Sequence, residues 1–165
     1  MEPRVSLAEE MQRASSAFTE ATRIIRGLME DIRLGKQIEI ATTRPTVEKI
    51  AASVLRNSNA MMTMRRLKNL DDYTFLHSVN VCAMLVSFAK VVDLEMQSIH
   101  DIALGGLLHD VGKMRVVAAI LNKPARLSSD EFRHMKSHVV LGSDIIRQLS
   151  GIPPLALEPI EHHHE

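Results

Sequence analysis

The sequence predicts an all-α protein, and three observations lead to this fold class. Helical spacing of apolar residues runs through nearly all of its 165 residues. No segment shows the alternation of apolar and polar residues that half-buried strands show. Apolar residues make up 45% of the chain, which is enough to build one helical core. The length fits a single domain with an appendage.

The N-terminal segment carries the clearest helical pattern. Alternating steps of four and three residues give an apolar seam over residues 7–32, made of Leu7, Met11, Ala14, Phe18, Ala21, Ile25, Leu28 and Ile32. Gly35 is expected to end this helix, because glycine readily takes the left-handed conformation that follows a helix. Two interpretations of the seam stay open. It packs on the chain's own domain, or it joins two copies as a dimerising helix or signalling stalk.

Helix start and stop signals divide the rest of the chain into a series of predicted helices. We expect helices at residues 46–67, 73–91, 95–109 and 128–149, a last one from about 155, and a short apolar helix in the loop 114–127. Asp71 or Asp72 can cap the helix that starts at Tyr73. Ser128 and Glu131 form a capping box at the start of the helix 128–149.

The bulk composition argues against several classes of function. The 20 basic and 20 acidic side chains cancel, and few aromatic side chains are present to stack bases, so generic nucleic-acid binding is not expected. Cys82 is the single cysteine and cannot form an internal disulfide, which fits a reducing compartment. The most apolar stretch, residues 81–92, is interrupted by Ser87 and Lys90 and is short for a bilayer span. We therefore expect a cytoplasmic protein with no membrane insertion.

Histidines recur along the predicted helices. His77 shares one helix face with apolar residues, and His138 lies on a later helix in a similar setting. Taken alone, each is more often a hydrogen-bonded core residue than a metal ligand. The stretch "LLHDVGK" adds His109 and Asp110 at the end of an apolar run, and "EHHHE" closes the chain. Coincidence among unrelated core histidines becomes the weaker explanation once four elements each supply inward-facing ligands.

These residues together predict a metal centre in the core of a helical bundle, where dinuclear sites are commonly built. Imidazole nitrogens and carboxylate oxygens suit iron, manganese or zinc better than calcium or magnesium. Neighbouring residues on a helix point about 100° apart. His109 and Asp110 can therefore serve the same centre only near a helix end or where two ions lie together. A carboxylate can bridge two ions, which an imidazole cannot.

The motifs over about residues 73–165 resemble the HD-GYP domain, a branch of the HD metal-dependent phosphohydrolases. The resemblance rests on "HSVNV", "LLHDVGK", "ILNKPARLSSDEFRHMKSHVVLGSDII" and "IEHHHE". It implies an HD-type helical bundle over residues 69–165 and a helical N-terminal extension, for dimerisation or regulation, over residues 1–68. The family's "DGxGYP" stretch and a further ligand aspartate follow "HHE", so we expect the C-terminal part of the domain to be absent from this chain.

The resemblance also implies a set of site residues. The metal ligands would be His77, His109, Asp110, His138, His163 and His164, with Asp110 bridging two ions that are usually iron or manganese. His162 falls outside the motif. Lys113 would act with Asp110 in catalysis by contacting the substrate phosphate. Lys123 and Arg126 could steer the anionic substrate, or they are ordinary loop charges. Tyr73 stands where some family members carry a glutamate for a third metal, which favours two ions here.

The family hydrolyses cyclic di-GMP, a bacterial second messenger, to linear pGpG or to GMP. The resemblance therefore implies a phosphodiesterase whose nucleophile is a hydroxide held between two ions. Two alternatives stay open. The same metal centre could act on another nucleotide or phosphate ester. The chain could instead be a degenerate module that binds the dinucleotide, or a partner through residues 7–32, without turnover.

Overall fold

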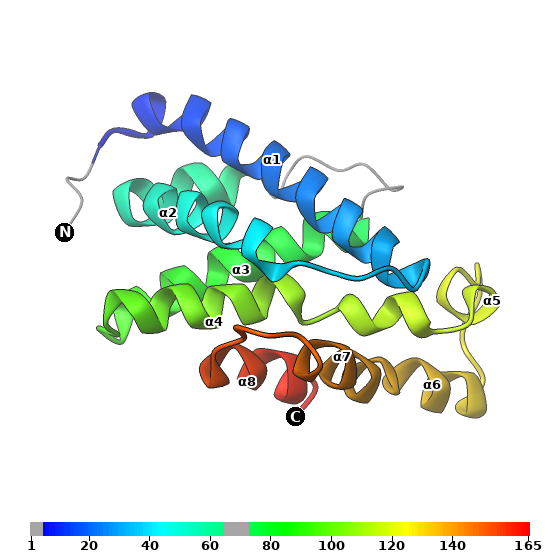
Figure 1. The fold of residues 1–165 in the computed structure, drawn as a ribbon. Coiled ribbons are helices and arrows are strands. Elements are labelled where there is room, and N and C mark those ends of the chain that lie inside the picture. The colour runs from blue at the N-terminus through cyan, green and yellow to red at the C-terminus, as the bar shows by residue number, and fades with distance from the viewer. Residues whose placement is uncertain (1–4, 65–72) are drawn as a thin grey trace.

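The computed structural model describes residues 5–64 and 73–165, and the prediction of an all-α fold is confirmed for these two ranges, which contain no strand. The elements follow in the order α1 (Leu7–Arg33), η1 (Ile40–Thr42), α2 (Arg44–Met64), α3 (Tyr73–Val91), α4 (Met96–Leu108), η3 (Val111–Arg115), α5 (Ala118–Leu121), α6 (Ser129–Lys136), α7 (His138–Arg147) and α8 (Pro154–His162). Figure 1 shows them in three tiers, with α1 and α2 above, α3 and α4 in the middle, and α6, α7 and α8 below.

The N-terminal helix α1 is bounded as the sequence predicts. A capping box joins Ser6 and Glu9 at its start, and Gly35 follows its end with a φ of 69°. The seam is buried from Ala14 to Ile32, and α1 packs mainly on α2. The seam therefore belongs to the chain's own core. Dimerisation through the same residues would require α1 to leave this core, and the homodimer stays a prediction.

Helix α2 begins two residues earlier than expected and is kinked. Asn57 leaves the helical conformation, with φ −156° and ψ 99°. Its side-chain oxygen accepts a hydrogen bond from the Asn59 backbone N–H at 3.1 Å, and its amide nitrogen donates to the Val5 carbonyl at 2.9 Å. Asn57 therefore caps the part of α2 that follows the kink. Its side chain also holds the segment before α1 at the kink through Val5. The predicted end at residue 67 and the cap at Asp71 or Asp72 lie outside the described residues.

Helices α1 and α2 are also joined by a buried ion pair. The Glu10 carboxylate is fully buried and accepts hydrogen bonds from Nε and Nη2 of Arg56, both at 2.8 Å. Such a two-point contact fixes the angle between the two side chains as well as their separation. It therefore sets the register of α1 on α2.

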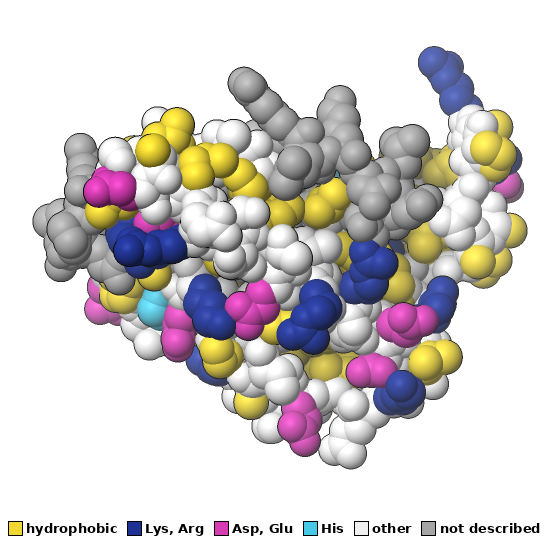
Figure 2. Space-filling model, turned by 90° about the horizontal axis from the view of Figure 1, so that it is seen from above, with side chains coloured by type: hydrophobic (Ala, Val, Ile, Leu, Met, Phe, Trp, Pro, Cys, Tyr) yellow, Lys and Arg dark blue, Asp and Glu magenta, His cyan; other side chains and the backbone are white. Residues whose placement is uncertain are grey.

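The face of the molecule on the side of α1 and α2 carries both positive and negative side chains. Figure 2 shows basic and acidic side chains interspersed over it. Exposed ion pairs of this part of the chain include Lys49 of α2 with Glu20 of α1, and Lys36 with Asp31, both at 2.8 Å. Among the described side chains, positive and negative charges are therefore mixed on this face, in keeping with the balanced composition.

Helices α3 and α4 have nearly the predicted bounds. Within the described residues, α3 alone is long and apolar enough to cross a membrane by length and composition, a test that buried core helices also pass, so the absence of membrane insertion stays a prediction. In the structure α3 packs on α4 and α2. Part of its apolar surface, at Met84, Phe88 and Val91, stays exposed. The face that carries His77 thus lies at the surface of the bundle and not deep within it.

The predicted helix 128–149 is wrong as a single helix, because it breaks at Ser137 into α6 and α7. The capping box of Ser128 and Glu131 is confirmed at its start. Both the backbone N–H and the hydroxyl of Ser137 donate to the His134 carbonyl, at 3.1 and 2.7 Å. These bonds close the last turn of α6, and α7 then begins with His138.

Two glycines let the lower tier approach α4 and η3 closely. A Cβ added at Gly112 in η3 would lie 1.9 Å from the His138 carbonyl oxygen and 2.5 Å from the Gly142 nitrogen of α7. A Cβ at Gly105 in α4 would lie 2.3 Å from the Ala156 carbonyl oxygen of α8. Only a residue without a side chain fits at such distances. The glycines therefore hold α7 and α8 against the segment that carries His109 and Asp110.

Candidate metal centre

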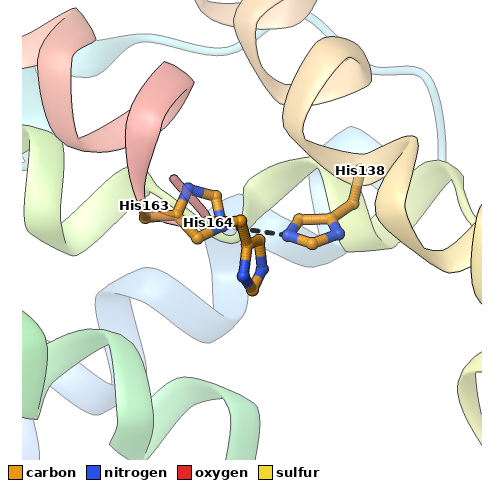
Figure 3. A group of neighbouring side chains, drawn as sticks. All are labelled: His138, His163 and His164. Atoms are coloured by element: carbon orange, nitrogen blue, oxygen red, sulfur yellow. Dashed lines mark hydrogen bonds between the residues drawn. The ribbon is translucent and has the colours of Figure 1, made fainter.

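The six predicted ligands come from four separate parts of the fold and converge on one centre. His77 comes from α3, His109 and Asp110 from the junction of α4 and η3, and His138 from α7, while the last two follow α8. They form two groups, and within each group the ligand atoms lie within 4.8 Å of one another. One group is His77, His109 and Asp110, and the other is His138, His163 and His164. Figure 3 shows the three rings of the second group facing one another.

Asp110 belongs to the first group, but its carboxylate also faces the second. Its Oδ2 is 3.3 Å from Nε2 of His109 and 3.8 Å from Nε2 of His77. Its Oδ1 is 3.5 Å from Nε2 of His138 and 3.9 Å from Nε2 of His163. The side chain is only 1% exposed, and Oδ1 has no hydrogen-bond partner among the described residues. A buried carboxylate oxygen without a partner is costly, and a cation at this place would remove that cost.

Backbone carbonyls fix the orientation of three of the histidine rings. In each case Nδ1 lies at 2.7–3.1 Å from a carbonyl three or four residues earlier in the chain: Gly106 for His109, Met135 for His138, and Pro159 and Ile160 for His163. A carbonyl can only accept, so Nδ1 carries the hydrogen. Nε2 of each ring then points into the centre, which is the nitrogen left for a metal ion in such histidines.

This arrangement places two lone pairs against each other. Nε2 of His138 and Nε2 of His163 are 3.0 Å apart, and both rings already use Nδ1 as a donor. Two facing lone pairs repel unless a proton or a metal ion lies near them. The donor set of imidazole nitrogens and one carboxylate suits iron, manganese or zinc. The residues present therefore fit a transition-metal centre.

The local electrostatics keep three of the ligands, Asp110, His138 and His163, in the protonation states that metals require. Burial would raise the pKa of the Asp110 carboxyl, but the adjacent His109 and then Lys113 outweigh it and hold this pKa well below its usual range. Burial lowers the pKa of His138, and burial with the nearby His109 lowers the pKa of His163 to about 4. The carboxylate is thus charged and these two rings are neutral near pH 7, which is what metal coordination needs.

Comparison with known proteins now identifies the family. A profile of the HD domain matches residues 74–165, more than half of the chain. The chain belongs to the HD domain family. The matched range contains all six residues of the two ligand groups, and Tyr73 lies immediately before it.

Curated relatives of this HD domain protein are phosphodiesterases of cyclic dinucleotides. The chain is 37% identical to a cyclic di-GMP phosphodiesterase of Pseudomonas aeruginosa over 98% of its own length and 39% of the relative. It is 32% identical to a cyclic di-GMP phosphodiesterase of Thermotoga maritima over 58% of the chain and 26% of the relative. It is 28% identical to a 3′3′-cGAMP-specific phosphodiesterase of Vibrio cholerae over 66% of the chain and 25% of the relative. No solved structure gives a significant match.

The three basic residues singled out in the sequence lie in different places in this HD domain. Nζ of Lys113 is 2.6 Å from Oδ2 of Asp110, inside the centre. Nζ of Lys123 binds the Glu131 carboxylate at 2.6 Å, and Arg126 is exposed on the same loop. This loop joins α5 to α6 at the end of the molecule away from α8 (Figure 1). The structure thus brings Lys113 to the ligands, while Lys123 is partly neutralised by its own partner.

Some features of the HD domain's centre were not found from the sequence. The carbonyls that orient the rings are backbone groups, so residue type gives no signal for them. The ring of Tyr73 lies parallel to that of His77, at 7° with centroids 6.0 Å apart, and their i,i+4 spacing could have indicated this contact. His162 contacts Glu165 at 2.9 Å and belongs to neither ligand group.

Proposed function

We propose that this chain is the metal-binding part of a cyclic di-GMP phosphodiesterase of the HD-GYP branch, which yields pGpG or GMP. The observation that carries the proposal is the Asp110 carboxylate, which lies between two histidine groups with one oxygen facing each. Relatives that hydrolyse cyclic di-GMP support the substrate. The chain spans about two fifths of the length of the P. aeruginosa relative, so the whole protein's activity is part of the proposal.

We propose two divalent transition-metal ions, iron or manganese, as the resident cofactors. His77, His109 and Asp110 would hold one ion, and His138, His163 and His164 the other, with Asp110 bridging them. The tyrosine at position 73, where some family members carry a glutamate for a third metal, supports two ions and not three. When bound, such a pair supplies a hydroxide nucleophile near neutral pH and neutralises charge on the phosphate.

The remaining work falls to the chain's own side chains. The Nδ1–H groups of His109, His138 and His163 donate to backbone carbonyls, and these bonds keep the rings from turning. Lys113 places a compact positive charge beside Asp110, where it can bind a non-bridging oxygen of the scissile phosphate. Lys123 and Arg126 would act only at longer range, by attracting the anionic dinucleotide from the loop between α5 and α6, and Lys123 less so because Glu131 pairs with it.

A second substrate is favoured by a specific observation. Relatives from V. cholerae act on 3′3′-cGAMP, which differs from cyclic di-GMP in one base. The same centre could therefore hydrolyse a mixed cyclic dinucleotide. A degenerate module without turnover is the weaker alternative, because such a module has no need for six converging ligands.

Turnover by paired variants of adjacent histidines tests the proposal. His163→Ala removes a predicted ligand, whereas His162→Ala removes a ring that binds Glu165 outside the ligand groups. We expect the wild-type chain with Mn²⁺ or Fe²⁺ to convert cyclic di-GMP to linear product, His162→Ala to keep this rate within a few fold, and His163→Ala to lose it. Turnover of 3′3′-cGAMP alone would support the second substrate. Equal rates in both variants would refute the site assignment.

Location and assembly complete the proposal. The balanced charge and the lone buried cysteine Cys82 support a cytoplasmic enzyme. A homodimer is expected only if surfaces other than the buried seam are used, or if α1 leaves the core. Light scattering of the purified chain over a range of concentrations would decide between monomer and dimer.

A further inference from the structure

Tyr73 lies at the edge of the metal centre with much of its ring in water. It is the first residue of α3 and is 69% exposed. One face of the ring lies against His77, whose Nε2 is 3.8 Å from Oδ2 of Asp110. The two parallel rings thus form a short stack that leads from the surface of the bundle to the proposed place of the phosphate.

We propose that a purine base of the substrate stacks on the exposed part of the Tyr73 ring while its phosphate lies at the metal centre. This inference rests on the proposed function, because it takes a nucleotide as the substrate. Aromatic side chains bind bases through their π-faces, and the interaction tolerates any base. Tyr73 would therefore select nucleotides over simple phosphate esters without distinguishing guanine from adenine.

The packing of α3 argues against a purely structural role for this ring. Phe75, two residues further on, is partly buried against the core and lies under the guanidinium of Arg26, 5.1 Å from the ring centroid. Tyr73 points to a different side of the helix, as residues two apart on a helix must. Its large exposed area contributes little to the core, whereas it offers an open aromatic surface next to a metal ligand.

The sequence provides a direct probe of this contact. The chain has one tyrosine and no tryptophan, so its intrinsic fluorescence reports on Tyr73 alone. We would titrate the Mn²⁺-loaded chain with a hydrolysis-resistant phosphorothioate analogue of cyclic di-GMP, correcting absorption with N-acetyltyrosinamide. Inorganic phosphate serves as the ligand without a base. We expect saturable quenching by the analogue, at the concentrations where calorimetry shows binding, and no quenching by phosphate.

Substitutions separate stacking from positioning of His77. Tyr73→Leu should raise KM for cyclic di-GMP by roughly 5- to 100-fold, as expected for loss of one base stack. Tyr73→Phe, which keeps the ring, should leave KM within about twofold of wild type. Both variants should keep the wild-type kcat, metal content and rate on methyl p-nitrophenyl phosphate, which has no purine. Loss of metal or of this last rate in Tyr73→Leu would mean that the ring only positions His77, and the inference would be wrong.

The same measurements distinguish failure of this inference from failure of the proposed function. If the analogue binds by calorimetry without quenching, or Tyr73→Leu keeps the wild-type KM, stacking is refuted and the phosphodiesterase proposal stands. If the wild-type chain holds its metals but binds neither cyclic di-GMP nor 3′3′-cGAMP, both are refuted. Quenching by 3′3′-cGAMP alone would support stacking while moving the substrate to the mixed dinucleotide.

Discussion

At the scale of single residues, the chemistry of the centre depends on where Asp110 lies and on how the histidine rings are oriented. Asp110 is adjacent to His109 in sequence, yet its second oxygen reaches a histidine group from α7 and the end of α8. Residue types predicted a metal centre supplied by four elements, and the resemblance to the HD-GYP domain implied which six residues would serve it; the structure brings these six together in two groups. The ring orientations could not be predicted, since they depend on carbonyls that every residue possesses.

Asp110→Asn tests the role of the bridging carboxylate. An amide has nearly the same shape but lacks the charge and presents an NH₂ donor on one side. We expect metal affinity to fall by at least about 100-fold, since even indirect partners of metal ligands contribute 10- to 100-fold. Asp144→Asn, on the exposed side of α7, is the matched control and should bind metal like the wild type. Isothermal titration with Mn²⁺ gives both affinities, and equal values would exclude bridging.

At the scale of single helices, the bounds agree with the sequence prediction where capping residues mark them. They differ from it where contacts with other helices determine where a helix ends. The bounds of α3 and the capping box of α6 could be read from the chain. The break at Ser137 could not, because it accompanies the close docking of Gly112 on α7. The exposed apolar face of α3 was likewise missed, since an apolar stripe does not state which partner covers it.

Gly112→Ala tests the docking of η3 on α7. The added methyl would overlap the His138 carbonyl, so η3 must move and carry Asp110 away from His138. We expect a loss of roughly 1–3 kcal/mol in the free energy of unfolding, as for an overpacked core, and weaker metal binding. Gly27→Ala is the control, because nothing lies within 4 Å of its added Cβ in α1. It should be neutral or stabilise the chain by up to about 1 kcal/mol. Urea unfolding of both variants would show whether they differ in this direction.

At the scale of the whole molecule, the N-terminal helices are joined to the rest of the fold by core packing. The N-terminal pair α1 and α2 packs on α3 and, through α1, on η3. The extension proposed for residues 1–68 is therefore in contact with the segment that carries Lys113. The sequence indicated a helical extension, but it could not show where on the domain the extension would lie.

The buried pair of Glu10 and Arg56 should make the stability of this arrangement depend on pH. The hydrogen bonds from Arg56 hold the pKa of Glu10 below its usual value of 4.5. Because the folded-state pKa is depressed, the stabilisation is present above the unfolded pKa and is lost as pH falls through the folded one.

Glu10→Gln isolates this contribution. It should cost about 3 kcal/mol at pH 7, since it removes the negative charge that faces a largely buried guanidinium, and it should flatten the loss of stability below pH 4.5. Lys49→Gln, which breaks an exposed pair with Glu20, should cost less than about 1 kcal/mol. Denaturant unfolding across this pH range measures both variants. A Glu10→Gln protein that follows the wild-type pH profile would contradict this account.

The central claim is that Asp110 joins two histidine groups into one dinuclear centre. Metal content per chain, measured by mass spectrometry on protein purified without oxygen and supplied with Fe²⁺ or Mn²⁺, tests it most directly. We expect about two ions per wild-type chain, and a marked loss in Asp110→Asn under the same conditions. No tightly bound metal in the wild-type chain, or the same content in both proteins, would contradict the claim.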